Sequence, residues 1–243
     1  MDRHLIWDGC ANVRDLGGLR TRDGARIRRG AIIRADALDR LSARGWTALE
    51  ASGVRTVIDL RNDDELGTDA AARPSGVTTL HLPLDGIEDT EFWKDWQGRP
   101  EFGTPLYYRA FLDHFPDRTA AVITAIARAE PGGVAVHCGI GRDRTGLIAI
   151  LLLALAGTEP EEIAADYALS EARVTSGRVG TFYEDRGITP GAVIAELLAD
   201  LDVEAYLRGA GVSDRDLGAI RERLLSAAGR PSRRAGAIPR PAR

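Results

Sequence analysis

Residues 137–146 have the sequence His137-Cys138-Gly139-Ile140-Gly141-Arg142-Asp143-Arg144-Thr145-Gly146, and they join two apolar segments of the chain. Residues 133–136 before them predict a short buried strand, and the apolar residues 147–156 after them predict a buried helix. A loop between such elements favours an anion, because the first amides of a helix have no partner within it and the helix dipole attracts negative charge.

Cys138 and Arg144 stand six positions apart in this loop, a spacing that suits chemistry on a phosphate group. The residues between them can wrap a tetrahedral oxyanion with successive amides facing inward, and Gly139 and Gly141 permit its close approach. Arg144 can hold two phosphate oxygens at once, and the surrounding positive field favours the nucleophilic thiolate of Cys138. The loop therefore predicts phosphoryl transfer through cysteine, with Cys138 and Arg144 as catalytic residues.

The rest of the loop is expected to bind the phosphate group through Gly139, Ile140, Gly141, Arg142, Asp143 and Thr145. We also expect the Thr145 hydroxyl to donate to the sulfur, and His137 to orient the loop as a supporting residue. Taken singly, a buried cysteine or histidine is more often an inert core residue. The combination of these residues in a strand–loop–helix setting favours the functional interpretation.

The pattern HCxxGxDRTG resembles the signature of the cysteine-dependent protein tyrosine phosphatase superfamily. It is most similar to a bacterial and fungal tyrosine phosphatase branch that includes a secreted mycobacterial enzyme, although that branch usually has lysine where Arg142 stands. The resemblance extends over residues 9–227, through segments at 12–18, 33–38, 57–61, 165–167 and 206–213. It implies an α/β fold with a mostly parallel central sheet flanked by helices in three layers.

The resemblance also implies a reaction, the hydrolysis of phosphate monoesters through a phosphocysteine intermediate. The substrate it favours is a phosphotyrosine protein, with activity on phosphoserine, phosphothreonine or phosphoinositides as further expectations. A lipid-phosphate preference tied to the missing lysine stays open. So do two alternatives, a non-catalytic module that binds phosphorylated ligands and a sulfurtransferase of the rhodanese type.

Hydrolysis needs a general acid for the leaving oxygen, and Asp85 is our candidate. It follows the apolar stretch 80–84, and spacing alone gives catalysis and an ordinary turn residue equal weight. The resemblance places the role on Asp85, because the family's acid follows a similar strand and a proline. Glu88 and Asp89 are rivals in the same loop, and Asp143 is the alternative acid within the phosphate loop.

Composition favours one α/β domain with a proper core, since 44% of the residues are hydrophobic and 28% are charged. A net charge of −4 argues against nucleic acid as a partner. Cys10 and Cys138 do not make a disulfide framework, and an enzyme with a free thiolate suits a reducing compartment. We expect a cytoplasmic protein without a signal peptide or a transmembrane segment, although secretion without a signal stays open. Neither a metal nor another cofactor is expected, and the oligomeric state is open.

Strand and helix patterns alternate along the chain. Strands are predicted at 26–34, 54–60, 77–82 and 134–137, and helices at 42–52, 104–130 with a break near Pro116, 147–156, and after Thr158, Thr189 and Ser213. The phosphatase domain should span residues 1–229, and the Arg/Pro-rich residues 230–243 should form a disordered tail.

Several residues outside the loop allow two interpretations. The aromatic residues of segment 85–105 fit either a satellite cluster or a lid over the phosphate site, and segment 171–189 is a second candidate lid. Structural salt bridges are the favoured role for Arg14, Asp15 and Arg61. Cys10 is a lesser candidate for a protective disulfide with Cys138.

Overall fold

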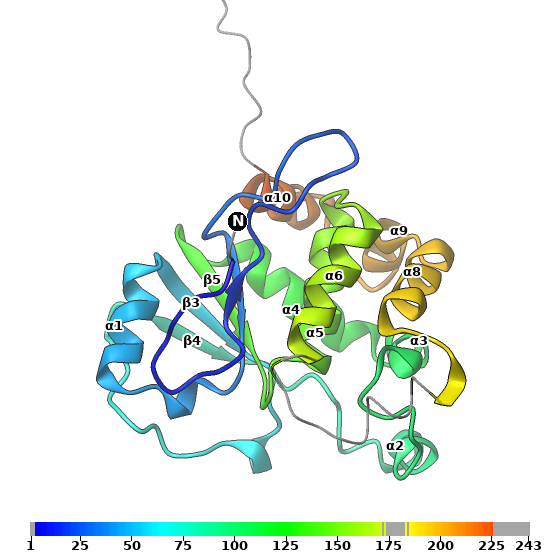
Figure 1. Cartoon of the computed structure of the whole chain (residues 1–243), viewed down its shortest axis with the longest axis horizontal. Helices are drawn as coiled ribbons and strands as arrows, with labels where there is room; N and C mark the ends of the chain where they lie inside the picture. Colours follow the sequence, from blue (N-terminus) through cyan, green and yellow to red (C-terminus); the bar gives the residue numbers. More distant parts are fainter. Residues whose placement is uncertain (1–2, 172, 174–182, 184, 226–243) are drawn as a thin grey trace, which may run out of the picture.

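The computed structural model describes residues 3–171, 173, 183 and 185–225, and its centre is a mixed five-stranded sheet (Figure 1). The strand order is β1-β2-β5-β3-β4. Strands β2, β5, β3 and β4 run parallel, and only the short β1 pairs antiparallel with its neighbour β2. The bounds are Arg14–Asp15 for β1, Ile32–Ala35 for β2, Val54–Asp59 for β3, Thr78–His81 for β4 and Gly133–His137 for β5.

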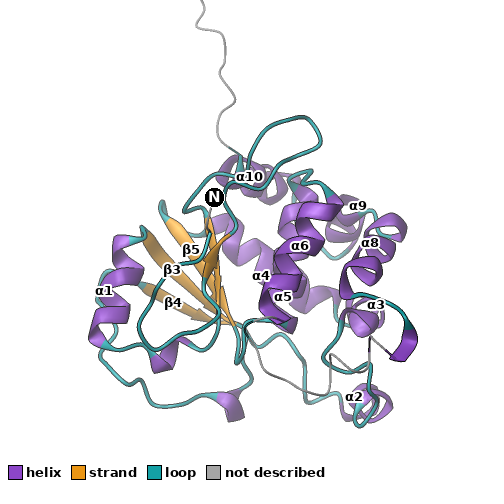
Figure 2. Ribbon diagram, viewed as in Figure 1, coloured by secondary structure: helices purple, strands orange, loops and turns teal. Residues whose placement is uncertain are grey.

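Helices cover both faces of this sheet (Figure 2). Helix α1 lies on one face, and α4, α5 and α6 lie on the other, so the chain forms the three layers that the sequence predicts. The helices are α1 (Ala43–Ala51), α2 (Thr90–Trp96), α3 (Tyr108–His114), α4 (Pro116–Arg128), α5 (Asp143–Leu155), α6 (Pro160–Glu171), α8 (Pro190–Asp200), α9 (Val203–Gly209) and α10 (Asp214–Leu224). Three 3-10 segments span Leu38–Arg40, Asp63–Glu65 and Pro105–Tyr107.

Alternation along the buried strands separates two apolar clusters. In β2, Ile33 packs in the cluster that contains Trp46 of α1, whereas the preceding Ile32 packs in the cluster that contains α5. Successive side chains of a strand point to opposite faces, so a strand buried on both sides is apolar throughout. The same principle explains β5, in which every residue from Gly133 to His137 is buried.

Helix α5 carries the phosphate loop into the larger cluster. All but three of its residues are buried, and the three are Asp143, Arg144 and Ala154. This helix therefore lacks a polar face, which fits its place between the sheet and the outer helices. No helix in the described part of the chain is long and apolar enough to cross a membrane.

Most predicted elements are confirmed, and the differences have local causes. The predicted strand 26–34 is shorter, because Ile27 makes only an isolated bridge to Leu225. Strand β1 and helices α2 and α9 were not predicted. Thr158 does not cap α6 with its side chain, since its hydroxyl is buried and has no partner in the described residues. Residues 230–243, predicted as a tail, lie outside the described residues.

Candidate active site

The carboxyl ends of the parallel strands bring the predicted site together. Cys138 follows the central strand β5, Asp36 follows β2, and Arg61 stands two residues after the end of β3. Open α/β sheets place ligands at this edge. The loop approaches β2 closely, because a Cβ atom on Gly141 would lie 2.4 Å from the carbonyl oxygen of Ala35, and Gly141 has a φ of 69°. Only glycine adopts this conformation at low cost.

Cys138 is buried beneath the loop, with 1% of its surface exposed, and Arg144 follows it in the first turn of α5. The guanidinium of Arg144 donates from both Nη atoms to the carboxylate of Glu65, with Nη2 2.6 Å from Oε1. Partial burial alone would raise the pKa of Glu65, but the hydrogen bonds from Arg144 hold it below its ordinary value. Glu65 thus fixes the orientation of the arginine.

Asp85 reaches the same guanidinium from a different loop. Its Oδ2 lies 3.1 Å from Nη1 of Arg144 and accepts a hydrogen bond of 3.0 Å from Nδ2 of Asn62. Its carbonyl oxygen accepts a hydrogen bond from the indole of Trp93, which anchors the loop to α2. Burial raises the pKa of the Asp85 carboxyl, although Arg144 and Asn62 act in the opposite direction. A raised pKa favours the protonated form that a general acid requires.

The other candidate acids are engaged elsewhere. Glu88 pairs with Arg118, and Asp89 caps α2 through the amide of Phe92 and pairs with His114 at 2.7 Å. The structure brings neither of these side chains into contact with Arg144.

Asp143 is held within the phosphate loop. Its carboxylate accepts hydrogen bonds from Nε of Arg142 at 3.2 Å and from the hydroxyl of Tyr167 at 3.2 Å. Burial raises the pKa of Asp143, and Arg142 opposes that effect. Asp143 therefore faces α6, whereas Asp85 faces Arg144.

Arg142 does not extend into solvent, since 5% of its surface is exposed. Besides its contact with Asp143, it donates from Nη2 to the carbonyl oxygen of Gly103 at 3.0 Å. The positive charge at this position therefore links the phosphate loop to the segment that follows α2.

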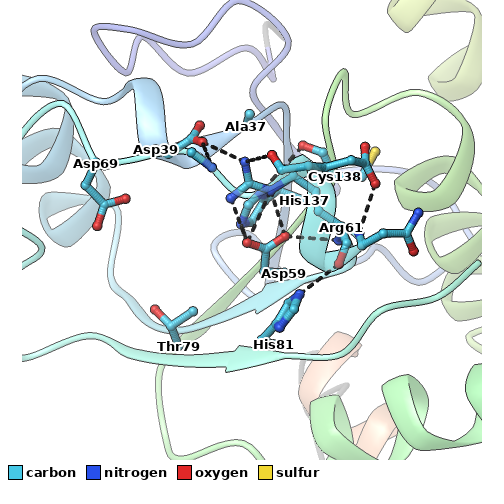
Figure 3. A network of polar contacts seen from close by, with 12 residues as sticks. Ala37, Asp39, Asp59, Arg61, Asp69, Thr79, His81, His137 and Cys138 are labelled. Atoms are coloured by element: carbon cyan, nitrogen blue, oxygen red, sulfur yellow. Dashed lines mark hydrogen bonds and ion pairs between the residues drawn. The ribbon is translucent and has the colours of Figure 1, made fainter.

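His137 belongs to a buried polar network beside the loop (Figure 3). Its Nε2 lies 3.5 Å from Oδ2 of Asp59, and Asp59 also pairs with Arg61, which reaches Asp39 at 2.7 Å. Burial lowers the pKa of His137 to about 4, despite the attraction of Asp59, so the ring is neutral near pH 7. The predicted salt bridge of Arg61 is present, and the supporting role of His137 stays a prediction.

Other predicted contacts differ. The Thr145 hydroxyl is buried and makes no hydrogen bond with a described residue, so its predicted donation to sulfur is not made here. Asp15 accepts from the amides of Gly17 and Gly30 rather than forming an ion pair with a described residue. Cys10 and Cys138 are free thiols, and Cys10 donates to the carbonyl oxygen of Ala37.

The aromatic segment between Asp85 and Pro105 is a packed cluster around α2. Trp93 is buried and makes ring contacts with residues of α2, α3 and the following segment, which are Phe92, Phe102, Tyr107, Phe111 and Phe115. The aromatic residues therefore pack onto the body as predicted, but as part of the larger apolar cluster and not as a separate satellite. The prediction that this segment also closes over the site stays a prediction.

Sequence reasoning missed Glu65 and Asn62, which lie in and before a 3-10 segment after β3. A local signal was present, because Asn62 and Glu65 have the spacing of a capping box, and Oε2 of Glu65 accepts from the amide of Asn62 at 2.9 Å. That pattern indicates a turn and does not indicate a partner 79 residues away.

Comparisons with known proteins place the chain in a family. The model of a family described as the tyrosine phosphatase family matches residues 5–226. A tyrosine-protein phosphatase of Nostoc commune is 32% identical over 212 residues, which cover 77% of this chain and 71% of the relative. The triple specificity protein phosphatase PtpB of Mycobacterium tuberculosis is 27% identical over 162 residues, which cover 55% of this chain and 58% of that protein.

Among solved structures, one match is P. aeruginosa TpbA in complex with pTyr. Its TM-score is 0.41 at 17% sequence identity, and the match covers 75% of this chain and 86% of TpbA.

Proposed function

The chain belongs to the tyrosine phosphatase family and is a phosphatase, and we propose that it hydrolyses phosphotyrosine in proteins through a phosphocysteine on Cys138. The observation that carries the proposal is the meeting of Asp85 with Arg144 at the loop that holds Cys138. A nucleophile, an anion-binding guanidinium and a protonated carboxyl are the three groups that this reaction needs.

The reaction proceeds in two steps. The thiolate of Cys138 attacks the phosphorus atom, the bond from phosphorus to the leaving oxygen breaks, and Asp85 gives its proton to that oxygen. A water oxygen then attacks the phosphocysteine, the bond from sulfur to phosphorus breaks, and the Asp85 carboxylate takes a proton from the water. Arg144 and the loop amides hold the remaining phosphate oxygens in both steps.

The contacts of the two aspartates support Asp85 as the acid. Asp85 pairs with the arginine that would grip the phosphate group, and Asn62 orients its carboxyl. Asp143 is tied to Arg142 and Tyr167 and acts in this proposal as part of the loop framework. The loop residues Gly139, Ile140, Gly141, Arg142, Asp143 and Thr145 form the phosphate cradle.

Activity on phosphoserine, phosphothreonine and phosphoinositides is part of the proposal at a lower rank. For phosphoinositides, Arg142 supports that ranking, because its guanidinium is engaged with Asp143 and Gly103 and is largely buried. A second phosphate group on a substrate would have to draw Arg142 away from these partners.

The test measures phosphate release from a phosphotyrosine peptide, a phosphothreonine peptide and a phosphoinositide, by the wild type and by Cys138→Ser. We expect the fastest release from the phosphotyrosine peptide and none from Cys138→Ser. Binding without turnover in the wild type would support the binding module instead. Transfer of sulfur from thiosulfate to cyanide, without phosphate release, would support the sulfurtransferase.

A further inference from the structure

The carbonyl oxygens of the phosphate loop are bound from outside the loop. Four consecutive carbonyls each accept a hydrogen bond from another segment of the chain. The pairs are Gly139 with the amide of Ala37 at 3.2 Å, Ile140 with Nδ2 of Asn12 at 3.0 Å, and Gly141 and Arg142 with Nη2 of Arg34 at 2.8 and 3.3 Å.

These contacts determine where the loop amides point. In a trans peptide unit, the carbonyl of one residue and the N–H of the next point in opposite directions across a rigid plane. A donor that holds the carbonyl of Gly141 toward β2 therefore turns the N–H of Arg142 away from β2. The same holds for the amides of Ile140, Gly141 and Asp143. Inward-facing amides are what an anion cradle requires.

The side-chain donors themselves are fixed by one buried carboxylate. Asp166 of α6 pairs with Arg34 at 2.8 Å and with Arg14 at 3.0 Å, and Arg14 donates to Oδ1 of Asn12 at 2.7 Å. Arg3 also pairs with Asp166, at 2.6 Å. Burial alone would raise the pKa of Asp166, but the arginines hold it well below its ordinary value, so the Asp166 carboxylate stays charged.

Backbone contacts complete the arrangement. Asp36, just after β2, accepts from the amide of Asn12 at 2.9 Å and thereby places the Asn12 side chain under the loop. Arg34 is itself a residue of β2, paired in register with Val136 of β5. Arg34 is therefore set on the rigid sheet, whereas Asn12 lies in the bend before β1 and is held there by Asp36 and Arg14.

We propose that Arg34 and Asn12, held by Asp166, are positioning residues that preorganise the phosphate loop for the transition state. The proposal rests on the proposed phosphatase function. It gives a role in catalysis to residues that do not touch the substrate. Preorganised donors lower a barrier because they need no reorientation when charge develops. Amides that are free to reorient should therefore weaken binding of the transition state more than binding of the ground state.

Arg34→Lys is the main test variant. A lysine keeps the positive charge beside Asp166, but its single ammonium cannot also reach two carbonyls as the planar guanidinium does. We expect kcat for a phosphotyrosine peptide to fall by about 10- to 100-fold, with KM changed by less than about threefold. Inhibition by orthovanadate, which mimics the transition state, should weaken more than inhibition by inorganic phosphate.

Arg223→Lys is the matched control. Arg223 of α10 also donates to several carbonyls, those of Ala129, Glu130 and Gly132, at the turn between α4 and β5 and away from the phosphate loop. Arg223→Lys likewise removes a guanidinium that bonds several carbonyls. The loss of thermal stability in this variant therefore measures the purely structural cost of such a substitution. We expect wild-type kcat and an unchanged ratio of vanadate to phosphate inhibition.

The outcomes separate this proposal from the proposed function. If wild-type protein releases no phosphate, the proposed function fails before the positioning role is tested. If the wild type is active and folded Arg34→Lys keeps its kcat and its vanadate-to-phosphate ratio, the positioning role is wrong. Should Arg34→Lys not fold, Asn12→Ala decides by the same readouts, because it removes the donor to Ile140 alone among the loop contacts.

Discussion

Nη1 of Arg144 lies 3.1 Å from Oδ2 of Asp85, although Arg144 lies in the first turn of helix α5 and Asp85 follows strand β4. The carboxylate of Glu65 accepts hydrogen bonds from both Nη atoms of the same guanidinium. In the proposed reaction, a phosphate dianion that enters the loop competes with these carboxylates for Arg144, and it then lies within reach of Asp85, the proposed acid. The proposal therefore couples substrate binding and placement of the proton donor through a single side chain.

Asp85→Asn should lower kcat/KM by about 10²- to 10⁴-fold for a phenyl phosphate substrate with a poor leaving group. The loss should be smaller for p-nitrophenyl phosphate, whose leaving oxygen needs less protonation. Steady-state rates on the two substrates measure the contrast. Glu88→Gln is the control, because Glu88 pairs with Arg118 and should leave both rates unchanged. Equal losses on both substrates would remove Asp85 from the acid role.

The pH profile gives the same assignment an independent check. Burial raises the pKa of Asp85, so the protonated acid persists to higher pH than an ordinary aspartate would. The rate should fall as pH rises through this raised pKa, because the proton donor is lost. In Asp85→Asn that falling limb should be absent from the kcat/KM profile, which reports the pKa values of the free enzyme.

Arg144→Lys should reduce kcat by roughly 10²- to 10³-fold, because one ammonium cannot replace two parallel donors on the phosphoryl oxygens. Arg128→Lys is a matched control. Arg128 makes a similar two-bond contact with the carboxylate of Asp216, at 3.0 and 2.9 Å, and lies on helix α4. Wild-type kcat in Arg128→Lys beside a large loss in Arg144→Lys is the expected result. Comparable losses in both variants would indicate a general effect of such substitutions.

His137 should make the folded state sensitive to mild acid. Its pKa is about 4 in the folded state and near 6.5 in the unfolded chain, so only the unfolded chain takes up a proton between these values. The free energy of unfolding should therefore fall by roughly 2–3 kcal/mol from neutral pH to about pH 4.5 because of this fully buried group. Urea unfolding of wild type and His137→Gln across this range measures the difference. Parallel pH curves would exclude the effect.

Gly141→Ala and Gly157→Ala form a matched pair at positive φ, with values of 69° and 73°. An alanine at either position costs roughly 1–2 kcal/mol of strain. At Gly157 no other atom lies within 4 Å of the new Cβ, whereas at Gly141 it meets the carbonyl oxygen of Ala35. We expect Gly141→Ala to lose more thermal stability and at least about tenfold in kcat, because the loop must move off β2. Equal behaviour of the two variants would refute that close approach.

The sequence predicts the centre of this molecule well, because strong local patterns specify it. The apolar run 147–156 and the glycine-rich loop before it leave few alternatives, and β5 lies where it was expected. Helix α5 begins at Asp143, four residues before the predicted start, so Arg144 lies on the helix and not on the loop. Strand β1 has two residues, too few for a periodic pattern. Helix α2 was not predicted, because the aromatic residues that its packing requires do not indicate a helix in the sequence.

The supporting contacts of the site were beyond prediction for a different reason. Glu65 and Arg144 are 79 positions apart, and Arg34 and Asp166 are 132 apart. Local periodicity carries no information on which distant charged residues will meet. Arg34 and Asp166 lie in two of the segments that resemble the family. Only the pairing of β2 with β5, however, places Arg34 beside the phosphate loop.

The central claim is that a phosphoryl group passes through Cys138, and one experiment observes it directly. Asp85→Asn, turning over p-nitrophenyl phosphate, is quenched in acid, and mass spectrometry locates the phosphoryl group. We expect it on the peptide with Cys138, because loss of the carboxylate slows attack by water in the second step. A phosphoryl group on another residue, or none while p-nitrophenol is released, would rule out a phosphocysteine on Cys138.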